Sequence, residues 1–145
     1  MTTIHIREAV LADAEVVVQL IEELAAHGND HSPLTAAYLA DYLAAHSTIL
    51  LAERGQQVVG LLAYSLRPNL YHAADGCLIE ELIVHSAARG QGVGSALLTE
   101  TLNRAKAHGC AEISVSTMPD NQAAIRLYRA HGLTEEVVLL EKHFN

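Results

Sequence analysis

Hydrophobic and polar positions follow two different periods along the chain, which predicts a mixture of strands and helices. Residues 4–7 alternate between apolar and polar, as in a short strand with one buried face. After Asp13 and Glu15, acidic residues that favour a helix start, apolar residues recur at steps of three and four: Val17, Leu20, Ile21 and Leu24. Further along, the pattern predicts a helix over 34–45, strands over 48–53 and 57–66, a loop over 67–76, a strand over 77–84, a helix over 92–108, a strand over 111–116, a helix over 121–130 and a last strand over 137–141.

The order of these elements predicts an α/β fold with a mixed central β-sheet flanked by helices. Arg54-Gly55 separates two apolar runs and favours a hairpin, so the middle strands should be antiparallel. The strand, helix and strand between Cys77 and Ser116 should form a parallel unit with a right-handed crossover. No linker, repeat or low-complexity stretch divides the 145 residues, and this length suits one hydrophobic core. We therefore expect a single domain over 1–145.

Composition and charge limit the kinds of molecule that the protein is expected to bind. Half of the residues are hydrophobic and 18% are charged, which is typical of a globular chain. No apolar run reaches the ~18 residues of a membrane span, so no membrane partner is expected. The net charge of −8 disfavours nucleic acid and suits a cationic partner. Two cysteines are too few for a disulfide framework, and the N-terminus lacks the regions of a signal peptide, so we expect a cytoplasmic protein.

The nine histidines do not indicate a metal site. Three predicted helices end in the tripeptide Ala-His-Gly, at 26–28, 107–109 and 130–132. Glycine supplies the left-handed residue just past a helix end, and a histidine there complements the helix dipole. The sequence contains neither a His-Glu-x-x-His nor a Cys-x-x-Cys pattern, so we expect no metal.

The stretch with the most chemical information is a glycine-rich turn between a predicted strand and a predicted helix. It consists of Arg89, Gly90, Gln91, Gly92, Val93 and Gly94. Glycines let backbone N–H groups face outward, and a helix start adds unpaired donors and a positive dipole end, so the turn suits a pyrophosphate. Two known phosphate motifs fit poorly. A dinucleotide fingerprint needs glycine or alanine where Ser95 stands, and the Gly-Lys-Ser/Thr of a P-loop is absent.

Two segments together carry a resemblance to a known family. Residues 89–94 match the fixed positions of R/Q-x-x-G-x-G/A, the acetyl-CoA motif of the GNAT superfamily of N-acetyltransferases. Residues 121–133 resemble the N-x-x-A-x-x-x-Y-x-x-x-G-F/L segment of that family, with Leu133 where phenylalanine is commoner. Spacing and order agree, and the predicted element order covers nearly the whole chain. The sequence therefore resembles a GNAT N-acetyltransferase.

The resemblance implies a fold, a cosubstrate and a set of binding residues. In such proteins the fourth and fifth strands splay apart, and the acetyl-pantetheine arm of acetyl-CoA fills the gap while its pyrophosphate lies on the amides of the glycine turn. The arm would pair with backbone groups near Val84, Asn121 would hydrogen-bond it, and Tyr128 would approach the thioester sulfur. Besides the turn, the implied cofactor-binding residues are Leu82, Ile83, Val84, Asn121 and Tyr128. Dimers are frequent in the family, so the resemblance also allows a homodimer.

Acetyl transfer by direct attack of an amine in a ternary complex needs a proton acceptor and two donors. Glu80 and Glu81 are the candidate bases. Because they are adjacent in a strand, their side chains should point to opposite faces unless a bulge intervenes, and the register to Val84 favours Glu80. The N–H near Val84 is the candidate donor to the oxyanion, and Tyr128 is the candidate acid for the leaving thiolate. In this interpretation the catalytic residues are Glu80, Glu81 and Tyr128.

Two other functions stay open on the sequence alone. A non-catalytic acyl-CoA-binding module that senses or regulates would keep the turn but has no need for Glu80, Glu81 and Tyr128. A nucleotide- or phosphate-binding interaction domain would use the same turn. The acceptor is open as well, because an amine of a polyamine, an aminoglycoside, an amino acid or a peptide suits an acidic protein.

Overall fold

The computed structural model describes residues 3–45 and 47–144, which form a five-stranded sheet in the order β1-β2-β3-β4-β5. The strands are β1 (Ile4–Glu8), β2 (Ser47–Arg54), β3 (Gln57–Asn69), β4 (Ala74–Val84) and β5 (Glu112–Val115). The first four are antiparallel to their neighbours, and β5 runs parallel to β4. The predicted central hairpin and the predicted parallel unit are therefore confirmed.

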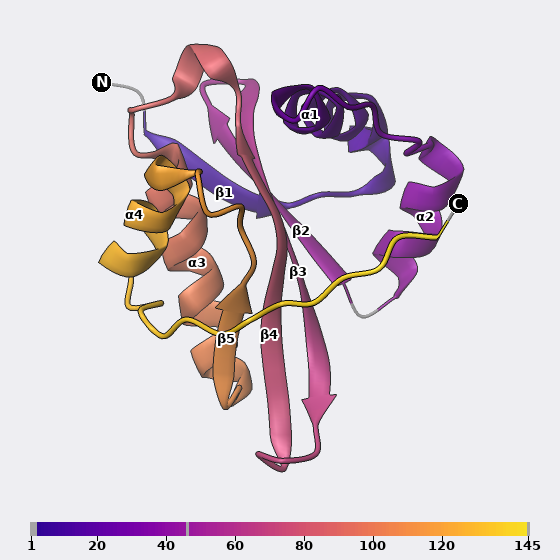
Figure 1. Cartoon of the computed structure of the whole chain (residues 1–145). Coiled ribbons are helices and arrows are strands. Elements are labelled where there is room, and N and C mark those ends of the chain that lie inside the picture. Colours follow the sequence, from indigo (N-terminus) through magenta and orange to yellow (C-terminus); the bar gives the residue numbers. More distant parts are fainter. Residues whose placement is uncertain (1–2, 46, 145) are drawn as a thin grey trace.

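Among the described residues, four helices and two short 3-10 turns complete the fold. They are η1 (Leu11–Asp13), α1 (Ala14–His27), α2 (Ala36–Ala44), η2 (Ser86–Ala88), α3 (Val93–His108) and α4 (Gln122–Ala130). α1 and α2 cover one face of the sheet, and α3 and α4 cover the other (Figure 1). No helix in the described part of the chain has the length and apolar character that a bilayer crossing requires.

The central strands are buried on both faces, which explains why their sequences are continuous apolar runs. In β3, Leu61 packs into the core under α1 and α2, and Leu62 packs into the core under α3 and α4. Both side chains are fully buried. Close contact between sheet and helix depends on Gly60, because a Cβ atom there would lie 2.8 Å from Cγ1 of Val93 in the first turn of α3.

The predicted loop over 67–76 is wrong for most of its length. β3 continues to Asn69 and β4 begins at Ala74, and these two residues are paired in the ladder. Only residues 70–73 form the turn. The extended end of this hairpin pairs through its backbone, with Asn69 partly exposed and Leu70 fully exposed, so its sequence lacks the apolar pattern that identifies buried strands.

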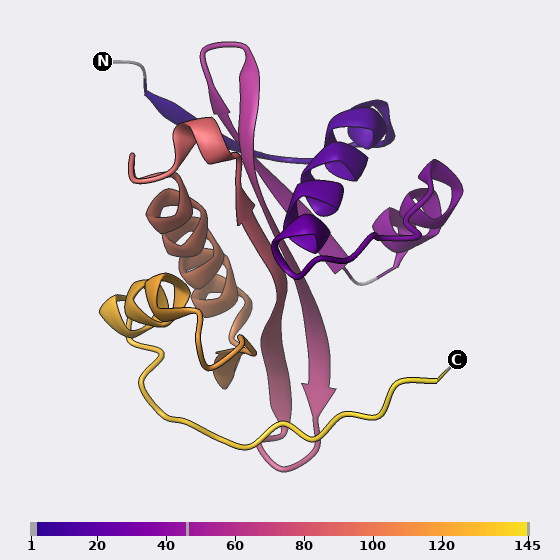
Figure 2. The same cartoon turned by 45° about the horizontal axis from the view of Figure 1, so that its top comes forward.

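The predicted last strand over 137–141 is also wrong. Residues 133–144 contain no strand or helix. The segment runs past the end of the sheet toward α2 (Figure 2). Its apolar run predicts a strand, but a strand needs a hydrogen-bonded neighbour, and the large side chains of the run are exposed, Val137 by 89% and Leu140 by 88%.

The prediction of a left-handed glycine just past the helix end is confirmed for two of the three helices. Gly109 after α3 and Gly132 after α4 have φ of 89° and 93°, the left-handed conformation expected past a helix end. After α1 the left-handed residue is Asn29, with φ of 56°, whereas Gly28 has φ of −99°. The helix still ends at His27, and the left-handed position moves one residue on to Asn29, because asparagine tolerates this conformation better than most other residues with a side chain.

Candidate active site

A gap opens between β4 and β5 because their pairing is short. The two strands are in register from Gly76 with Glu112 to Ile79 with Val115. β5 ends there, whereas β4 continues to Val84 along β3. Beyond Ile79 the two strands splay apart, as the resemblance implies.

The backbone of β4 directs hydrogen-bonding groups into this gap. The His85 N–H donates to the Val59 carbonyl of β3 at 2.8 Å. Because backbone groups alternate in direction along an antiparallel ladder, the polar groups of Ile83 also face β3, and those of Leu82 and Val84 face away from it. The Val84 carbonyl accepts from Nε of Arg89 at 3.1 Å, so the N–H groups of Leu82 and Val84 are the donors directed toward the gap.

A β-bulge in β4 affects the directions in which the two glutamate side chains point. Ala63 of β3 lies opposite Glu81, whereas Tyr64 lies opposite Ile79, so Glu80 is the extra residue. A bulge interrupts the alternation of side chains along the strand. The sequence analysis expected Glu80 and Glu81 to point to opposite faces unless a bulge intervenes. Because the bulge is present, their side chains need not do so.

Tyr42 of α2 bonds Glu80 and is also influenced by the charge of Glu81. The Tyr42 hydroxyl donates to Oε2 of Glu80 at 3.2 Å. Burial raises the pKa of Tyr42 to about 12, with the charge of Glu80 contributing more than the charge of Glu81. Glu80 is thus held by α2, and Glu81 lies close enough to act on the same tyrosine.

Glu81 also lies close to Tyr128, which belongs to the opposite helix layer. Tyr128 in α4 is only 7% exposed, and burial followed by the charge of Glu81 raises its pKa to about 12. Burial and then the charge of Glu80 raise the pKa of Glu81 above its ordinary value. The charge of Glu81 thus acts on tyrosines of both helix layers.

The glycine turn joins the end of β4 to the start of α3. Gly90 and Gly92 have φ of 73° and 85°, and a Cβ atom on either would meet nothing within 4 Å, so both face open space. The first bond within α3 runs from the Ala96 N–H to the Gly92 carbonyl. The N–H groups of Val93, Gly94 and Ser95 therefore have no acceptor inside the helix, and the positive end of the helix dipole lies at the turn.

The side chains of Arg89 and Gln91 turn back toward the protein. The Arg89 guanidinium donates to Glu23 Oε2 at 3.2 Å and lies 2.7 Å from Nε2 of His27, both in α1. The Gln91 side chain accepts from Arg54. The open face of the turn is therefore formed by its backbone.

The resemblance implies that Asn121 binds the cofactor, and in the structure its side chain also caps a helix. Asn121 is the N-cap of α4, and its side-chain oxygen accepts from the Ala124 N–H at 3.2 Å. This leaves the side-chain NH₂ group as the donor for another partner. Two helical turns later, Tyr128 lies on the same helix.

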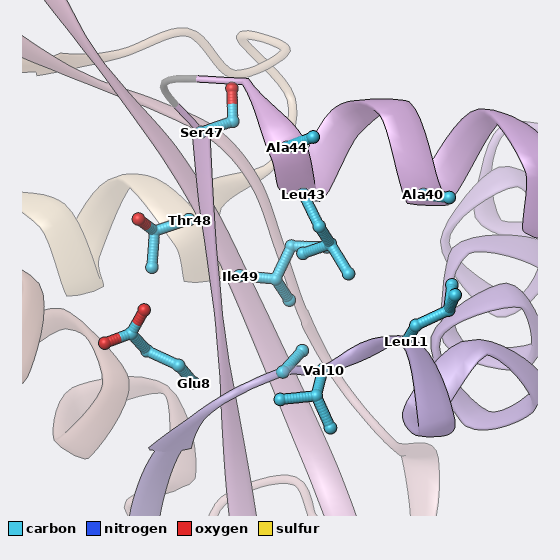
Figure 3. A pocket seen from close by; sticks show the side chains of 10 residues that line it. Glu8, Val10, Leu11, Ala40, Leu43, Ala44, Ser47, Thr48 and Ile49 are labelled. Carbon is cyan, nitrogen blue, oxygen red and sulfur yellow. The ribbon is translucent and has the colours of Figure 1, made fainter.

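A cavity elsewhere on the molecule contains none of the predicted site residues. It has a volume of about 370 Å³ and is lined by the end of β1, by α2 and by the start of β2. Leu43, Ile49 and Val10 gather in it, so its wall is mainly apolar (Figure 3). Nor does Cys77 offer a nucleophile, because burial raises the pKa of its thiol to about 12.

Comparison with known proteins decides the family. The sequence model of the Acetyltransferase (GNAT) family matches residues 15–133. The chain belongs to this family. It is 30% identical over 132 residues to the aminoalkylphosphonate N-acetyltransferase of Salmonella typhimurium, covering 91% of this chain and 86% of the relative. It is 29% identical over 109 residues to the aminoglycoside N(6')-acetyltransferase type 1 of Klebsiella aerogenes, covering 73% and 72%.

A solved structure shows the same fold at similar identity. The crystal structure of a transcriptional regulator from Bacillus halodurans C-125 superimposes with a TM-score of 0.84, at 31% identity over 98% of this chain and all of that one. Together with the family match, these likenesses make the chain a GNAT N-acetyltransferase that acts on an amine. Acetyl-CoA is the general acetyl donor of this family.

Sequence reasoning assigned no role to two residues that the structure places at the site. Tyr42 holds Glu80, and Glu23 contacts the residues before the glycine turn. Both contacts join residues far apart in sequence, so no local spacing signals them. In the structure, α1 and α2, which carry these two residues, cover the face of the sheet opposite to the one that α4 covers (Figure 1).

Proposed function

We propose that the gap between β4 and β5 binds the acetyl-pantetheine arm of acetyl-CoA and passes its acetyl group directly to a bound amine. The observation that carries the proposal is the end of β4–β5 pairing at Ile79. It leaves the N–H groups of Leu82 and Val84 directed into a gap that leads to the free N–H groups of α3. An extended amide-bearing arm followed by a pyrophosphate matches this order of donors.

The residues around the gap fit that cosubstrate. The backbone of residues 89–94 holds the pyrophosphate, and the β4 backbone of Leu82, Ile83 and Val84 lines the arm. The NH₂ group of Asn121 donates to the arm. Tyr128 lies next to the sulfur, in line with its position two turns further along α4.

Glu81 is the base that we favour, in place of Glu80. Its raised pKa lies closer to the pKa of an amine than that of an ordinary glutamate does, and its charge acts on tyrosines of both helix layers. Glu80 accepts a hydrogen bond from Tyr42 and adds negative charge beside Glu81. It therefore serves to attract the protonated amine and to raise the pKa of the base.

Acetyl-CoA supplies the acetyl group as a thioester. Glu81 takes a proton from the acceptor nitrogen, whose lone pair forms the new N–C bond. The Val84 N–H donates to the carbonyl oxygen on which negative charge develops. As the C=O bond re-forms, the C–S bond breaks and the sulfur leaves with the electron pair, while the Tyr128 hydroxyl donates a hydrogen bond to it. The nitrogen loses its second proton to solvent and becomes the neutral amide.

The acceptor that we propose is a small molecule or peptide with a cationic amine. The support is the pair Glu80 and Glu81 and the net charge of −8. Relatives are named for an aminoalkylphosphonate and for aminoglycosides, which are amines of different charge. We favour an acceptor with a second ammonium group, because a second cation relieves the repulsion between the two carboxylates.

A turnover screen tests the function. The protein is mixed with acetyl-CoA and single amines, among them polyamines, aminoglycosides, diamino acids and peptide amines, and released thiol is measured. We expect release that depends on both the amine and the protein. If CoA binds and no amine releases thiol, the chain is instead an acyl-CoA-binding regulatory module.

Two further expectations concern the molecule as a whole. We propose a homodimer, supported by the exposed apolar side chains of residues 137–144, which a second copy would cover. Light scattering at working concentration should give twice the chain mass, and a monomer mass would exclude the dimer.

The cytoplasmic location stays a prediction from the sequence, which cell fractionation tests.

A further inference from the structure

Glu23 of α1 is the centre of a hydrogen-bond cluster just before the glycine turn. Its Oε1 lies 2.7 Å from Nδ1 of His85, and its Oε2 accepts from the Ser86 backbone N–H at 3.1 Å and from the Arg89 guanidinium at 3.2 Å. One carboxylate thus bonds three groups within five residues of the chain. These residues form η2 and its flanks, the link between β4 and the turn.

Arg89 connects this cluster to the end of β4, beside the gap between β4 and β5. Its Nε donates to the Val84 carbonyl at 3.1 Å, and its Nη2 also lies 2.7 Å from Nε2 of His27 at the end of α1. The guanidinium therefore ties α1 to the end of β4 and to the first residue of the turn. Charge-assisted hydrogen bonds of this kind are stronger than neutral ones and fix geometry as well as distance.

The turn itself has few other restraints on its open side. Gly90 and Gly92 face open space, because a Cβ atom on either would meet nothing within 4 Å. The main further contacts of the turn are those of the Gln91 side chain with Arg54 and Ala87. Glycines allow many backbone conformations, so a turn that must present several N–H groups together needs fixed ends. The α3 helix fixes one end, and the Glu23 cluster fixes the other.

We infer that Glu23 is a positioning residue for cofactor binding, which holds the glycine turn in the shape that binds the pyrophosphate of acetyl-CoA. This inference rests on the proposed binding site. The hydrogen bonds of Glu23 go to His85, Ser86 and Arg89, so it acts on the turn through these residues. The helix that covers the opposite face of the sheet thereby sets the affinity for the cosubstrate.

The test compares Glu23→Ala with Glu22→Ala. Glu22 is the neighbouring residue of the same helix, and it accepts from the Ser32 N–H in the segment before α2 at 2.9 Å. We expect Glu23→Ala to raise the Kd for CoA by about tenfold, or about 1.4 kcal/mol. The KM for acetyl-CoA should rise similarly with kcat nearly unchanged, and Glu22→Ala should bind CoA like the original protein. Glu23→Gln keeps acceptor oxygen and shape, so it should recover part of the affinity.

Amide hydrogen exchange in the free protein gives a readout that a merely stabilising residue would not move. The Ser86 amide and the amides of the turn should exchange faster in Glu23→Ala, while those of the α3 interior should not. An unchanged CoA affinity in Glu23→Ala overturns the inference, and so does an equal loss in Glu22→Ala. If Glu23→Ala does not fold, Glu23→Gln decides by the same affinity measurement. A protein that binds no CoA in its original form rejects the proposed function instead.

Discussion

At the scale of single residues, the charge of Glu81 acts on Tyr128, and the proposed mechanism gives the two residues opposite tasks, base and hydrogen-bond donor. Burial and the nearby charge raise the pKa of Tyr128 to about 12, which keeps its hydroxyl protonated. A simple thiol has a pKa of ~8.5, so complete proton transfer from Tyr128 to the leaving sulfur is uphill. We therefore expect Tyr128 to stabilise the departing sulfur as a hydrogen-bond donor, with the proton arriving later from solvent.

Tyr128→Phe tests this role because it removes one oxygen and keeps the ring. We expect kcat to fall by ~10²-fold, the effect of a hydrogen bond to a developing charge and equal to roughly 2.7 kcal/mol. The melting temperature and CoA affinity should change little. The control is Tyr64→Phe, which removes the hydroxyl of another tyrosine buried in the same core. An unchanged kcat, with the chemical step limiting, would remove Tyr128 from the mechanism.

The two glutamates should respond differently to removal of their charge. Only the deprotonated form of a base is active, so the rate rises with pH as Glu81 loses its proton, and its raised pKa places this rise above the ~4.3 of an ordinary glutamate. Glu81→Gln should lower kcat by ~10²-fold near neutral pH, with a smaller loss at high pH where free amine is abundant.

Glu80→Gln removes the charge that helps to raise the pKa of Glu81. We therefore expect its pH–rate profile to move to lower pH, with a smaller loss of kcat than in Glu81→Gln. The measurement is the pH dependence of kcat for both variants. The reverse order of losses would make Glu80 the base.

At the scale of elements, the start of α3 combines a left-handed backbone conformation with an open surface. Gly92 has φ of 85° and faces open space, and Gly109 at the other end of the helix has φ of 89° and also faces open space. A side chain in the left-handed region costs roughly 1–2 kcal/mol at either position. The two glycines are thus matched in strain and differ only in their distance from the proposed pyrophosphate.

Gly92→Ala and Gly109→Ala should therefore lose similar stability and differ in binding. We expect both to lower the free energy of unfolding by a comparable amount. Only Gly92→Ala should weaken CoA binding, by about tenfold or more, because its methyl group occupies the space of the ligand. Calorimetric titration with CoA, together with denaturant unfolding, separates the two effects. Equal CoA affinities would place the pyrophosphate elsewhere.

The elements that sequence predicts well are those whose own residues carry the signal. The apolar stripe of α1 and the continuous apolar runs of β2 and β3 follow from burial, and the turn before α3 follows from its glycines. Residues 137–141 carry a strand-like pattern but lack a paired neighbour, which no local pattern reveals. The same holds for the bulge at Glu80, which comes from the register between two strands and removes the alternation on which the sequence-based preference for Glu80 depended.

At the scale of the whole molecule, charge acts on the two substrates with opposite sign. The chain has 17 acidic and 9 basic residues, which gives the net charge of −8, so its field attracts a cationic acceptor and repels anionic acetyl-CoA. In the proposed site, residues 89–94 therefore bind a pyrophosphate against the long-range field. Local donors at a helix start achieve this because their effect is confined to the first turn.

Ionic strength should separate these two effects in one enzyme. Salt shortens the Debye length from ~30 Å at 0.01 M to ~10 Å at 0.1 M, which screens the field of the whole molecule more than contacts within the site. We expect kcat/KM for a polycationic acceptor to fall by about tenfold over this range, because attraction at a distance is lost. The KM for acetyl-CoA should stay constant or decrease, because repulsion is lost. Initial rates at several salt concentrations, varying one substrate at a time, measure both. A fall in kcat/KM for both substrates would indicate a general effect of salt on the protein and contradict the proposed electrostatic selection of a cationic acceptor.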